Sequence, residues 1–341
     1  GVGARYGLLI KGIDALQKSY TTDALVLDKT GTLTVGKPSV TDCRTVDSSE
    51  KDALTIAASL ETGSTHPIAE AISKAHLETN TPLIAFDKVE NIGGMGLIGY
   101  FDNKEYAVGN QALMKSKGVN ISNEIDGLAD ILSDSNTVVF VSEGEKLIGW
   151  IEMKDKLRDT TNLAISKAKD LGLQVIMLTG DRAEAASSIS KEVGITRFEA
   201  EVKPDEKAAF IRKLQNDGAC VAMIGDGVND AAALAMADVG IAMGAGSDIA
   251  LEAADIVLLR DDLLDVVSTL ELGRATMGKI RGNLGWAFVY NLIGIPLAMG
   301  ALITWTGWLL PPAFAAGAMA FSSVSVVLNS LTLRSWAPHR A

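Results

Sequence analysis

The sequence predicts an α/β protein with a doubly wound parallel sheet, which is interrupted by an inserted α+β domain and followed by a transmembrane helical hairpin. Three observations support this fold class. Apolar runs of strand length alternate with amphipathic stretches of helix length, a segment of different texture separates the first run from the others, and no charged residue occurs between residues 283 and 333. Continuous apolar strands with helices between them are typical of a parallel sheet buried on both faces.

The length and charge of the chain limit what it can be. Its 341 residues are enough for more than one domain. Its formal net charge of −11 argues against a surface that neutralises phosphate backbones, so we expect no nucleic-acid partner. Leu8, Leu9, Ile13 and Leu16 recur at roughly helical spacing. This pattern predicts an amphipathic helix within residues 1–20, where we expect a cytosolic extension of a preceding membrane helix.

The parallel sheet is predicted to lie in residues 21–36 and 150–280. Its predicted strands are residues 24–27, 173–178, 219–224, 239–243 and 256–259, and the predicted helices between them include residues 160–171 and Pro204–Asn216. The inserted domain is predicted over residues 37–149. It contains paired helices at residues 51–60 and Pro67–Leu77, followed by strand-like runs at residues 94–108 and 137–148.

The predicted hairpin consists of residues 284–304 and 313–333. Each segment has the roughly 20 mostly apolar residues that a helix needs to cross a bilayer. Basic residues flank the hairpin while its turn is uncharged, which predicts that both ends face the cytosol. These basic residues are Arg274, Lys279, Arg281, Arg334 and Arg340. The alternative, two buried core helices, fits the length and the charge asymmetry poorly.

Polar loops follow three of the predicted strands. Asp28 comes directly after the first strand, Thr179 and Asp181 after the second, and residues 225–230 after the third. Because ligands bind at the carboxyl ends of parallel strands, we expect these loops to meet at one edge of the sheet. A carboxylate in that position can act as a nucleophile on a phosphoryl group.

The same edge is predicted to bind a divalent cation. Asp28, Asp226 and Asp230 supply the carboxylate oxygens that hold Mg²⁺. Lys207 can add a fixed positive charge and Thr179 a hydroxyl donor, which suits phosphoryl transfer because that reaction depends on positioning and electrostatics. The alternative for each loop alone is ordinary turn chemistry. Three such loops at three strand ends make that alternative the weaker one.

The run from Asp28 to Thr32, the run from Thr179 to Asp181 and the run from Gly225 to Asp230 together resemble the phosphorylation-domain signatures of P-type ATPases, which have a haloacid-dehalogenase-like fold. This resemblance implies that Asp28 is phosphorylated by MgATP. It assigns the further catalytic roles to Lys207, Thr179, Asp181, Asp226, Asn229 and Asp230, with Lys207 contacting phosphate. Mg²⁺ is implied to bind Asp28, the Thr30 carbonyl and Asp226, supported by Asp230, and Lys29 and Thr30 are implied to contact the nucleotide.

The inserted domain resembles the nucleotide-binding domain of heavy-metal P-type ATPases. The residues that carry this resemblance are Glu61, His66, Gly94, Gly96, Gly109 and Asn110. They imply that His66 lies beside the adenine with Glu61 hydrogen-bonded to it, and that the glycines let the backbone approach the nucleotide. One departure is Thr65, where this subclass often carries glutamate. Read without the resemblance, His66 is a solvated residue at the start of a helix.

Four residues of the hairpin place polar or thioether groups at membrane depth. Tyr290, Asn291, Met319 and Ser323 resemble the metal path of copper(I)-transporting members, and a soft thioether suits Cu(I). The alternative is helix packing, since Ser and Asn commonly bridge membrane helices and Met fills space. The Cys-Pro-Cys membrane motif of the subclass does not occur in this sequence.

The predicted function is ATP-driven export of Cu(I) through an aspartyl-phosphate, with ATP and Mg²⁺ as cofactors. The expected partners are the lipid bilayer, N-terminal membrane helices that complete the metal site, and a copper chaperone. We expect an integral protein of the cell membrane with cytoplasmic soluble domains. The alternatives are a P-type ATPase for another soft or transition metal, a haloacid-dehalogenase-type phosphatase, and a nucleotide-binding membrane module without turnover. Thr30 disfavours the phosphatase, because those enzymes typically carry a second Asp at that position.

Overall fold

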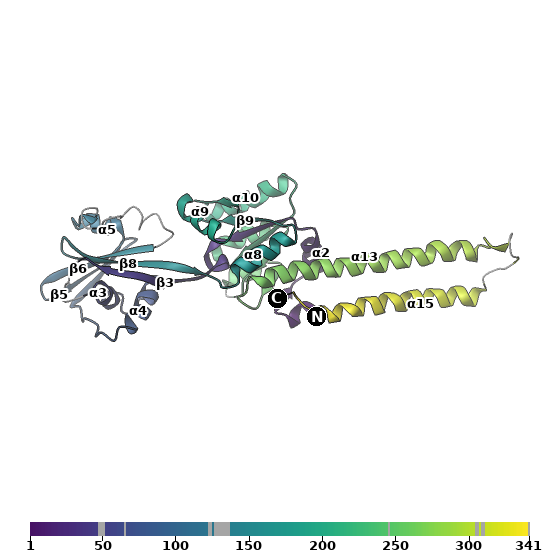
Figure 1. The fold of residues 1–341 in the computed structure, drawn as a ribbon, viewed down its shortest axis with the longest axis horizontal. Coiled ribbons are helices and arrows are strands. Elements are labelled where there is room, and N and C mark those ends of the chain that lie inside the picture. The colour runs from purple at the N-terminus through teal and green to yellow at the C-terminus, as the bar shows by residue number, and fades with distance from the viewer. Residues whose placement is uncertain are drawn as a thin grey trace. The chain divides into compact units, whose positions relative to one another are not determined.

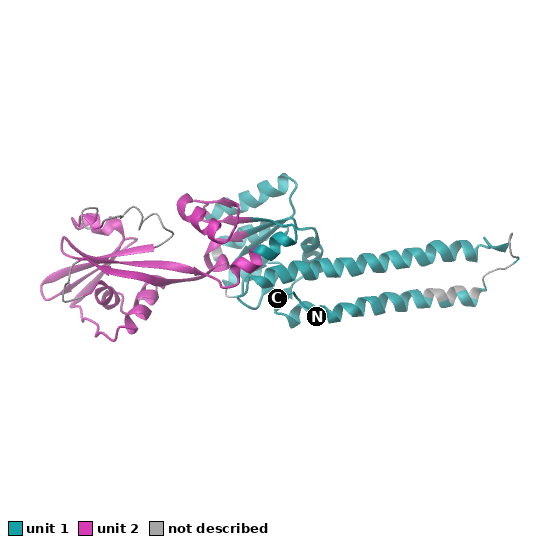
Figure 2. Cartoon of the chain, viewed as in Figure 1, with its two compact units in different colours: residues 1–26, 166–175, 204–341 teal, residues 27–165, 176–203 magenta. Residues whose placement is uncertain are grey.

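The computed structural model describes residues 1–46, 52–64, 66–121, 125, 137–244, 246–303, 307 and 311–339. Within these residues the chain forms two compact units, which are coloured separately in Figure 2. The first comprises residues 1–26, 166–175 and 204–341, and the second comprises residues 27–165 and 176–203. The division between them falls within strands β2 (Ala24–Asp28) and β9 (Gln174–Leu178).

A seven-stranded sheet forms the first part of the fold, with strand order β1-β13-β12-β11-β2-β9-β10. Its strands besides β2 and β9 are β1 (Leu8–Ile10), β10 (Arg197–Glu199), β11 (Val221–Gly225), β12 (Val239–Ala242) and β13 (Ile256–Leu258). β9 pairs with β10, β11 with β12 and β12 with β13 in parallel. All five residues of β2 and all five of β11 are buried, as the continuous apolar runs predicted.

The prediction of one amphipathic helix over Leu8 to Leu16 is wrong for Leu8 and Leu9, which lie in a strand. The chain forms a short helix α1 (Val2–Arg5), then strand β1, and only then helix α2 (Ile13–Thr21). β1 pairs antiparallel with β13, and the register places Leu8 opposite Leu258. Leu8 is buried, so its apolar side chain belongs to the core of the sheet. β1 is therefore an antiparallel edge strand in a sheet that was predicted to be parallel throughout.

A six-stranded antiparallel sheet forms the second part, with strand order β3-β8-β7-β6-β5-β4. Its strands are β3 (Thr34–Thr45), β4 (Lys88–Ile92), β5 (Gly96–Phe101), β6 (Lys104–Gly109), β7 (Thr137–Glu143) and β8 (Lys146–Leu157). Alternate residues of its strands point to two separate apolar clusters. Tyr106 and Val108 pack with helices α3 (Ala53–Leu60) and α4 (Pro67–Leu77), whereas Ala107 packs with α5 (Gln111–Ser116). The sheet thus has helices on both faces.

The remaining helices lie largely where the alternating pattern predicted them. They are α8 (Thr161–Asp170), α9 (Ala183–Glu192), α10 (Pro204–Asn216), α11 (Ala231–Met236) and α12 (Asp248–Ala253), together with the short helical turns η1 (Lys29–Leu33), η2 (Val228–Asp230) and η3 (Thr332–Ser335). Two of these turns, η1 and η2, follow the strand ends at which the sequence places Asp28 and Asp226.

Two long helices, α13 (Leu264–Ala298) and α15 (Pro312–Leu331), occupy the C-terminal part of the chain and pack against each other (Figure 1). The first ten residues of α13, up to Gly273, are mostly buried, and α2 packs against this helix. A methyl group on Gly273 would lie 2.9 Å from Cβ of Ser19, so the two helices are in close contact there. Across the described residues, no helix is both long enough and apolar enough to cross a membrane.

Candidate functional site

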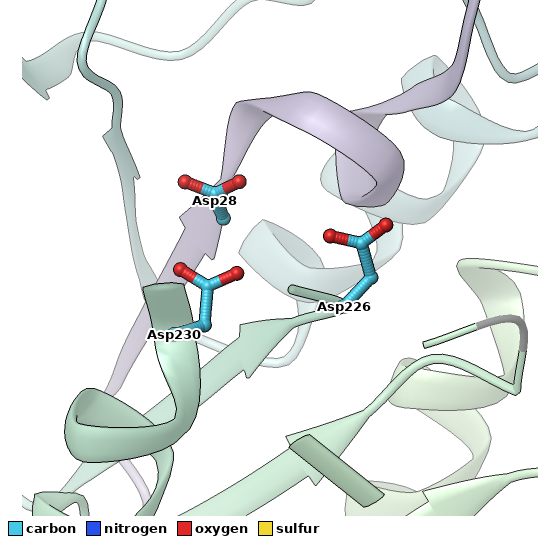
Figure 3. Close-up of side chains that lie close together, drawn as sticks. All are labelled: Asp28, Asp226 and Asp230. Carbon is cyan, nitrogen blue, oxygen red and sulfur yellow. The ribbon is translucent and has the colours of Figure 1, made fainter. Parts of the chain in front are cut away.

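Three carboxylates lie together at the strand ends of the seven-stranded sheet (Figure 3). Asp28 is the last residue of β2, Asp226 directly follows β11, and β2 and β11 are neighbours in the sheet. Each of Asp28, Asp226 and Asp230 offers one carboxylate oxygen, and these atoms all lie within 4.8 Å of one another. Asp28 and Asp230 are buried, and Asp226 is half-buried. Since like charges repel at such distances, this arrangement requires positive charge nearby.

Lys207, in the first turn of α10, supplies part of this charge. Its Nζ lies 2.7 Å from Oδ1 of Asp230, while Oδ2 of Asp230 accepts a hydrogen bond from the Gly227 amide at 3.2 Å. A methyl group on Gly225 would lie 2.6 Å from Cβ of Asp230, so glycine is needed at this position for Asp230 to pack. The acidic side chain is therefore fixed from three sides, and both of its oxygens have donors.

The turn after Asp28 has a defined geometry. Thr30 adopts φ −73° and ψ 127°, and Gly31 adopts φ 72° and ψ −9°. These are the dihedral angles of a type II turn, whose second central residue requires a positive φ that glycine adopts readily. Lys29 Nζ lies 2.5 Å from Oδ2 of Asp181, close enough for an ion pair although that oxygen makes no hydrogen bond of acceptable geometry. The turn that follows β2 is thus linked to the loop that follows β9.

Thr179 and Asn229 take different positions in these loops. Thr179 is buried, and its hydroxyl accepts a hydrogen bond from the Asp181 amide at 3.1 Å. Its own backbone amide donates to the Glu199 carbonyl at 3.0 Å, which connects the loop to β10. Asn229 lies in η2 and is exposed. Of these two residues, only Thr179 is buried and fixed by hydrogen bonds at this edge of the sheet.

A cavity of about 400 Å³ lies in the second unit, beside the six-stranded sheet. All six residues that the sequence assigns to nucleotide binding line it: Glu61, His66, Gly94, Gly96, Gly109 and Asn110. Apolar side chains that the sequence reasoning missed complete its wall: Ile68, Ile92, Met95, Leu97, Val108, Val138 and Val139. The alternation of β5, β6 and β7 is the signal that could have pointed to several of them. The cavity combines an apolar wall with a few polar groups, which is typical of small-molecule sites.

His66 and Asn110 each begin a helix at the edge of this cavity. Nδ1 of His66 accepts a hydrogen bond from the Ile68 amide at 3.2 Å and so caps α4. Oδ1 of Asn110 accepts from the Leu113 amide at 3.1 Å and caps α5, while its Nδ2 donates to the Gly94 carbonyl at 2.9 Å. Asn110 therefore joins the segment before β5 to the start of α5. Thr65, the departure noted in the sequence, lies outside the described residues.

Glu61 lies half-buried at the end of α3. Burial raises the pKa of its carboxyl group, and a hydrogen bond from Ser64 and the nearby His66 oppose that shift. The structure therefore brings Glu61 and His66 to the same cavity with an electrostatic interaction between them.

Two glycines of the cavity are also required for the pairing of β5 with β6, besides letting the backbone approach a ligand. A methyl group on Gly96, whose φ is 148°, would lie 2.2 Å from the Val108 carbonyl oxygen, and one on Gly109 would lie 2.2 Å from the Met95 carbonyl oxygen. At these two positions β5 and β6 approach each other too closely for any side chain. Gly94 differs, because its φ of 72° favours glycine while the space around it is open. Gly96 and Gly109 are therefore needed for strand pairing, whereas Gly94 is needed for its backbone conformation.

The four predicted metal-path residues are divided between α13 and α15. Tyr290 lines an open groove with Ala313, Phe314, Gly317 and Phe321, so it faces α15. Asn291 is exposed and its amide donates to the Ala287 carbonyl of its own helix at 2.9 Å. Ser323 is exposed and is not among the residues that line the groove. The side chain of Met319 lies outside the described part of the chain.

The sequence reasoning missed a group of residues at the end of β8. Asp155, Arg158 and Thr161 all form hydrogen bonds to residues 31–36, which begin within the turn after Asp28. Their sequence signal is weak, because charged residues at the end of a strand are ordinary on a protein surface. These residues lie beside residues 31–36 only because the chain comes back to the end of β2 after the long inserted domain.

The sequence model of the haloacid dehalogenase-like hydrolases matches residues 22–238. A probable copper-exporting P-type ATPase of Archaeoglobus fulgidus is 45% identical over 339 residues, which are 99% of this chain and 42% of that protein. A copper-exporting P-type ATPase of Bacillus subtilis is 43% identical over 336 residues, which are 98% of this chain and 41% of that protein. The chain thus spans less than half the length of these relatives.

Several solved structures resemble this one. A zinc-transporting PIB-type ATPase in an E2.Pi state superposes with a TM-score of 0.85 and 34% identity, covering 98% of this chain and 53% of that one. The catalytic domain of the CPx-ATPase CopB-B, in a study of its conformational changes upon nucleotide binding, superposes with a TM-score of 0.65 and 33% identity, covering 78% of this chain and 96% of that one.

Proposed function

The chain belongs to the haloacid dehalogenase-like hydrolase family and, within it, to the P-type ATPases, and from this we propose that it carries the ATP-binding and phosphoryl-transfer steps of a copper(I) exporter. The observation that carries the proposal is the convergence of Asp28, Asp226 and Asp230 beside the buried Lys207. A nucleophilic carboxylate, a set of oxygen ligands and a fixed cation are the parts that phosphoryl transfer to an aspartate needs.

In the proposed reaction, Asp28 is the nucleophile. One of its carboxylate oxygens forms a bond to the γ-phosphorus of ATP, the bond between that phosphorus and the β–γ bridging oxygen breaks, and ADP leaves. Water then attacks the acyl phosphate and releases phosphate, which restores Asp28. Asp28 is buried at the end of a strand, so its carboxylate approaches the phosphoryl group from a fixed direction.

Lys207 and the loop after β9 support this step. The Lys207 ammonium holds Asp230 and places positive charge where negative charge gathers on the transferring group. Lys29 is paired with Asp181, and Thr179 bonds the Asp181 amide, so the turn after Asp28 keeps one conformation relative to that loop. Asn229 precedes Asp230 in the chain. Its side chain is exposed, so it is accessible to a ligand that binds from solvent.

The carboxylate cluster fits Mg²⁺. Three oxygens within 4.8 Å of one another can share one small cation, and hard oxygen ligands are those that Mg²⁺ prefers. Asp28 and Asp226 would hold it with the Thr30 carbonyl, and Asp230, whose two oxygens already accept hydrogen bonds, would support the site. When bound, the ion neutralises charge on the phosphoryl oxygens.

The cavity beside the six-stranded sheet is the proposed adenosine site. Its apolar wall suits a purine ring, and Glu61, His66 and Asn110 supply polar groups around it. Nδ1 of His66 accepts the Ile68 amide, so the neutral ring carries its proton on Nε2 and presents a donor on the other side. The space beside Gly94 is open and leaves room for the sugar and phosphates. Lys29 and Thr30 are proposed to contact the phosphates from the turn after Asp28.

The membrane part of the proposal comes from the sequence and from the relatives. The uncharged stretch between residues 283 and 333 is proposed as a membrane hairpin. It contains the C-terminal part of α13 and all of α15, and these two helices pack against each other. Tyr290, Asn291, Met319 and Ser323 are proposed to form part of a Cu(I) path that faces membrane helices from the rest of the protein. The bilayer, those helices and a copper chaperone are the proposed partners, and the cell membrane is the proposed location.

Metal-dependent phosphate release tests the proposed cargo. In the full-length protein, we expect Cu(I) to stimulate ATP hydrolysis and Zn²⁺ to leave it unchanged. Met319→Ala should reduce copper stimulation and Cu(I) stoichiometry while nucleotide affinity stays normal. Stimulation by Zn²⁺ would instead favour an exporter of another transition metal, and phosphate release without an acid-stable phosphoenzyme would favour a phosphatase.

A further inference from the structure

The turn after Asp28 is held by a side chain that the proposed mechanism does not use. Arg158, one residue beyond β8, is half-buried and donates from Nε to the Thr32 carbonyl at 3.0 Å and from Nη2 to the Gly31 carbonyl at 2.6 Å. One planar guanidinium thus bridges two successive carbonyls. Such charge-assisted bonds in a fixed fork are stronger and more directional than bonds between neutral groups.

The next carbonyl in the chain is held from the same segment. The backbone amide of Arg158 donates to the Leu33 carbonyl at 3.0 Å, and the hydroxyl of Thr161 donates to the same oxygen at 2.8 Å. Thr161 is buried, so its bond is shielded from water. Three consecutive carbonyls, from Gly31 to Leu33, therefore accept hydrogen bonds from residues 158–161. These three carbonyls are thus all held by one short segment of the chain.

Asp155 holds the other end of the same turn. Its Oδ2 lies 2.5 Å from the hydroxyl oxygen of Thr34, and its Oδ1 accepts from the Gly36 amide at 3.0 Å. The Thr34 hydroxyl in turn accepts from the Gly31 amide at 3.2 Å. Gly31 is thus fixed through both its carbonyl and its amide, which matters because its positive φ defines the type II turn.

Strand β8 connects this turn to the cavity wall. β8 pairs with β7, with Met153 opposite Thr137 and Ile151 opposite Val139, and both Thr137 and Val139 line the cavity. The same strand continues to Asp155 and ends just before Arg158. A single element therefore joins the proposed adenosine site to the turn that carries Lys29 and Thr30.

We infer that Arg158, supported by Thr161, is a positioning residue that holds the turn after Asp28 in the geometry required for phosphoryl transfer. This inference rests on the proposed phosphorylation of Asp28. Asp28, Lys29 and Thr30 are consecutive, so a turn that shifts also moves the nucleophile and its neighbours relative to the phosphoryl group. A displacement on the order of 1 Å between reacting groups can cost about 100-fold in rate.

The test uses Arg158→Met, Arg158→Lys and the control Lys156→Met. Lys156 lies two residues earlier, and its ion pair with Asp159 is exposed on both sides, so its loss removes a nearby positive charge with little structural effect. Two quantities are measured in the full-length protein: the rate of phosphoenzyme formation from γ-labelled ATP, and nucleotide affinity without Mg²⁺. A third, amide hydrogen exchange over residues 29–34, is measured without nucleotide or metal.

We expect Arg158→Met to slow phosphoenzyme formation by about 100-fold and to accelerate exchange over residues 29–34 only. Nucleotide affinity should change far less than the rate, because the proposed adenosine site is the cavity beside the six-stranded sheet. Arg158→Lys should be intermediate, because an ammonium can reach one carbonyl but cannot reproduce the fork. Lys156→Met should match the wild type in all three measurements.

The outcomes separate this inference from the proposed function. Faster exchange with a normal rate of phosphoenzyme formation would overturn it, as would unchanged exchange in both Arg158 variants. A wild-type protein without a phosphoenzyme would contradict the proposed function instead, and the exchange measurement would still report whether Arg158 holds the turn. If Arg158→Met fails to fold, the comparison of Arg158→Lys with Lys156→Met decides the same question.

Discussion

Lys207 and Asp230 form a buried ion pair, with 2.7 Å between Nζ and Oδ1 and with exposed fractions of 6% and 1% for the two residues. Removing one partner of such a pair leaves a charge in a medium that solvates it poorly. Asp230 also belongs to the carboxylate cluster, so the pair offsets part of the negative charge beside Asp28. Its contribution to stability is therefore linked to the assembly of the site.

The first prediction concerns this pair. We expect Lys207→Met to lower the free energy of unfolding by about 3–5 kcal/mol, because Asp230 becomes a buried and unpaired charge. The double variant Lys207→Met/Asp230→Asn should be more stable than Lys207→Met, since it removes that charge, yet it should remain inactive. Urea unfolding of the single and double variants measures the difference. A double variant as unstable as the sum of the two single variants would mean that the residues are not coupled.

The second prediction distinguishes the glycines of the cavity. Gly96→Ala should be strongly destabilising and should weaken nucleotide binding, because the added methyl group would lie 2.2 Å from the Val108 carbonyl oxygen and force β5 from β6. Gly94→Ala should cost only about 1 kcal/mol, since it meets open space and suffers only from the positive φ. Thermal unfolding and calorimetric titration of both variants check this. Equal effects of the two substitutions would contradict the account.

The third prediction separates the two roles of His66. His66→Ala removes both the cap of α4 and the imidazole ring, so we expect a loss of about 1 kcal/mol of stability together with weaker ATP binding. His66→Asn can cap the helix again but has no ring, so stability should return while affinity stays low. Isothermal titration with ATP and thermal unfolding report the two effects. Normal ATP affinity in His66→Asn would show that His66 is a helix-start residue only.

The fourth prediction concerns pH. Burial raises the pKa of the Glu61 carboxyl group above its ordinary value, so this group stabilises the fold most when it is protonated, and that contribution is lost as pH rises through the folded-state pKa. Glu61→Gln mimics the protonated form. We expect it to be more stable than the wild type at neutral pH, and the difference to vanish below about pH 4, near the ordinary pKa of glutamate. Unfolding measured across this range tests the sign, and a difference that grows toward acid pH would contradict it.

The sequence predicted much of the fold because its signals are local. The buried runs that became β2 and β11, and the amphipathic pattern of α10, specify their elements through apolar periodicity and helix-start residues. The predicted helix was wrong over Leu8 to Ile10, because a three-residue strand at a sheet edge has too few residues to show a period of two. Only its pairing with β13 determines that it is a strand.

The candidate site was predictable as far as its residues follow strand ends. Asp28 and Asp226 could be placed together because neighbouring strands of one sheet end at a shared edge. The Lys207–Asp230 ion pair and the contacts of Arg158 with residues 31–33 could not, because they depend on side-chain rotamers and on where the chain returns after more than a hundred residues. These interactions arise from tertiary packing alone.

Acid-quenched labelling with γ-labelled ATP tests whether Asp28 is the phosphoryl acceptor. In the full-length protein that turns over ATP, we predict a labelled, hydroxylamine-sensitive adduct on Asp28, and no label in Asp28→Asn, which preserves size and hydrogen bonding but removes the nucleophilic carboxylate. Binding of ATP should be unchanged in this variant, because the proposed adenosine site belongs to a different sheet. Label that persists in Asp28→Asn at the wild-type level would contradict the assignment of Asp28 as the phosphoryl acceptor.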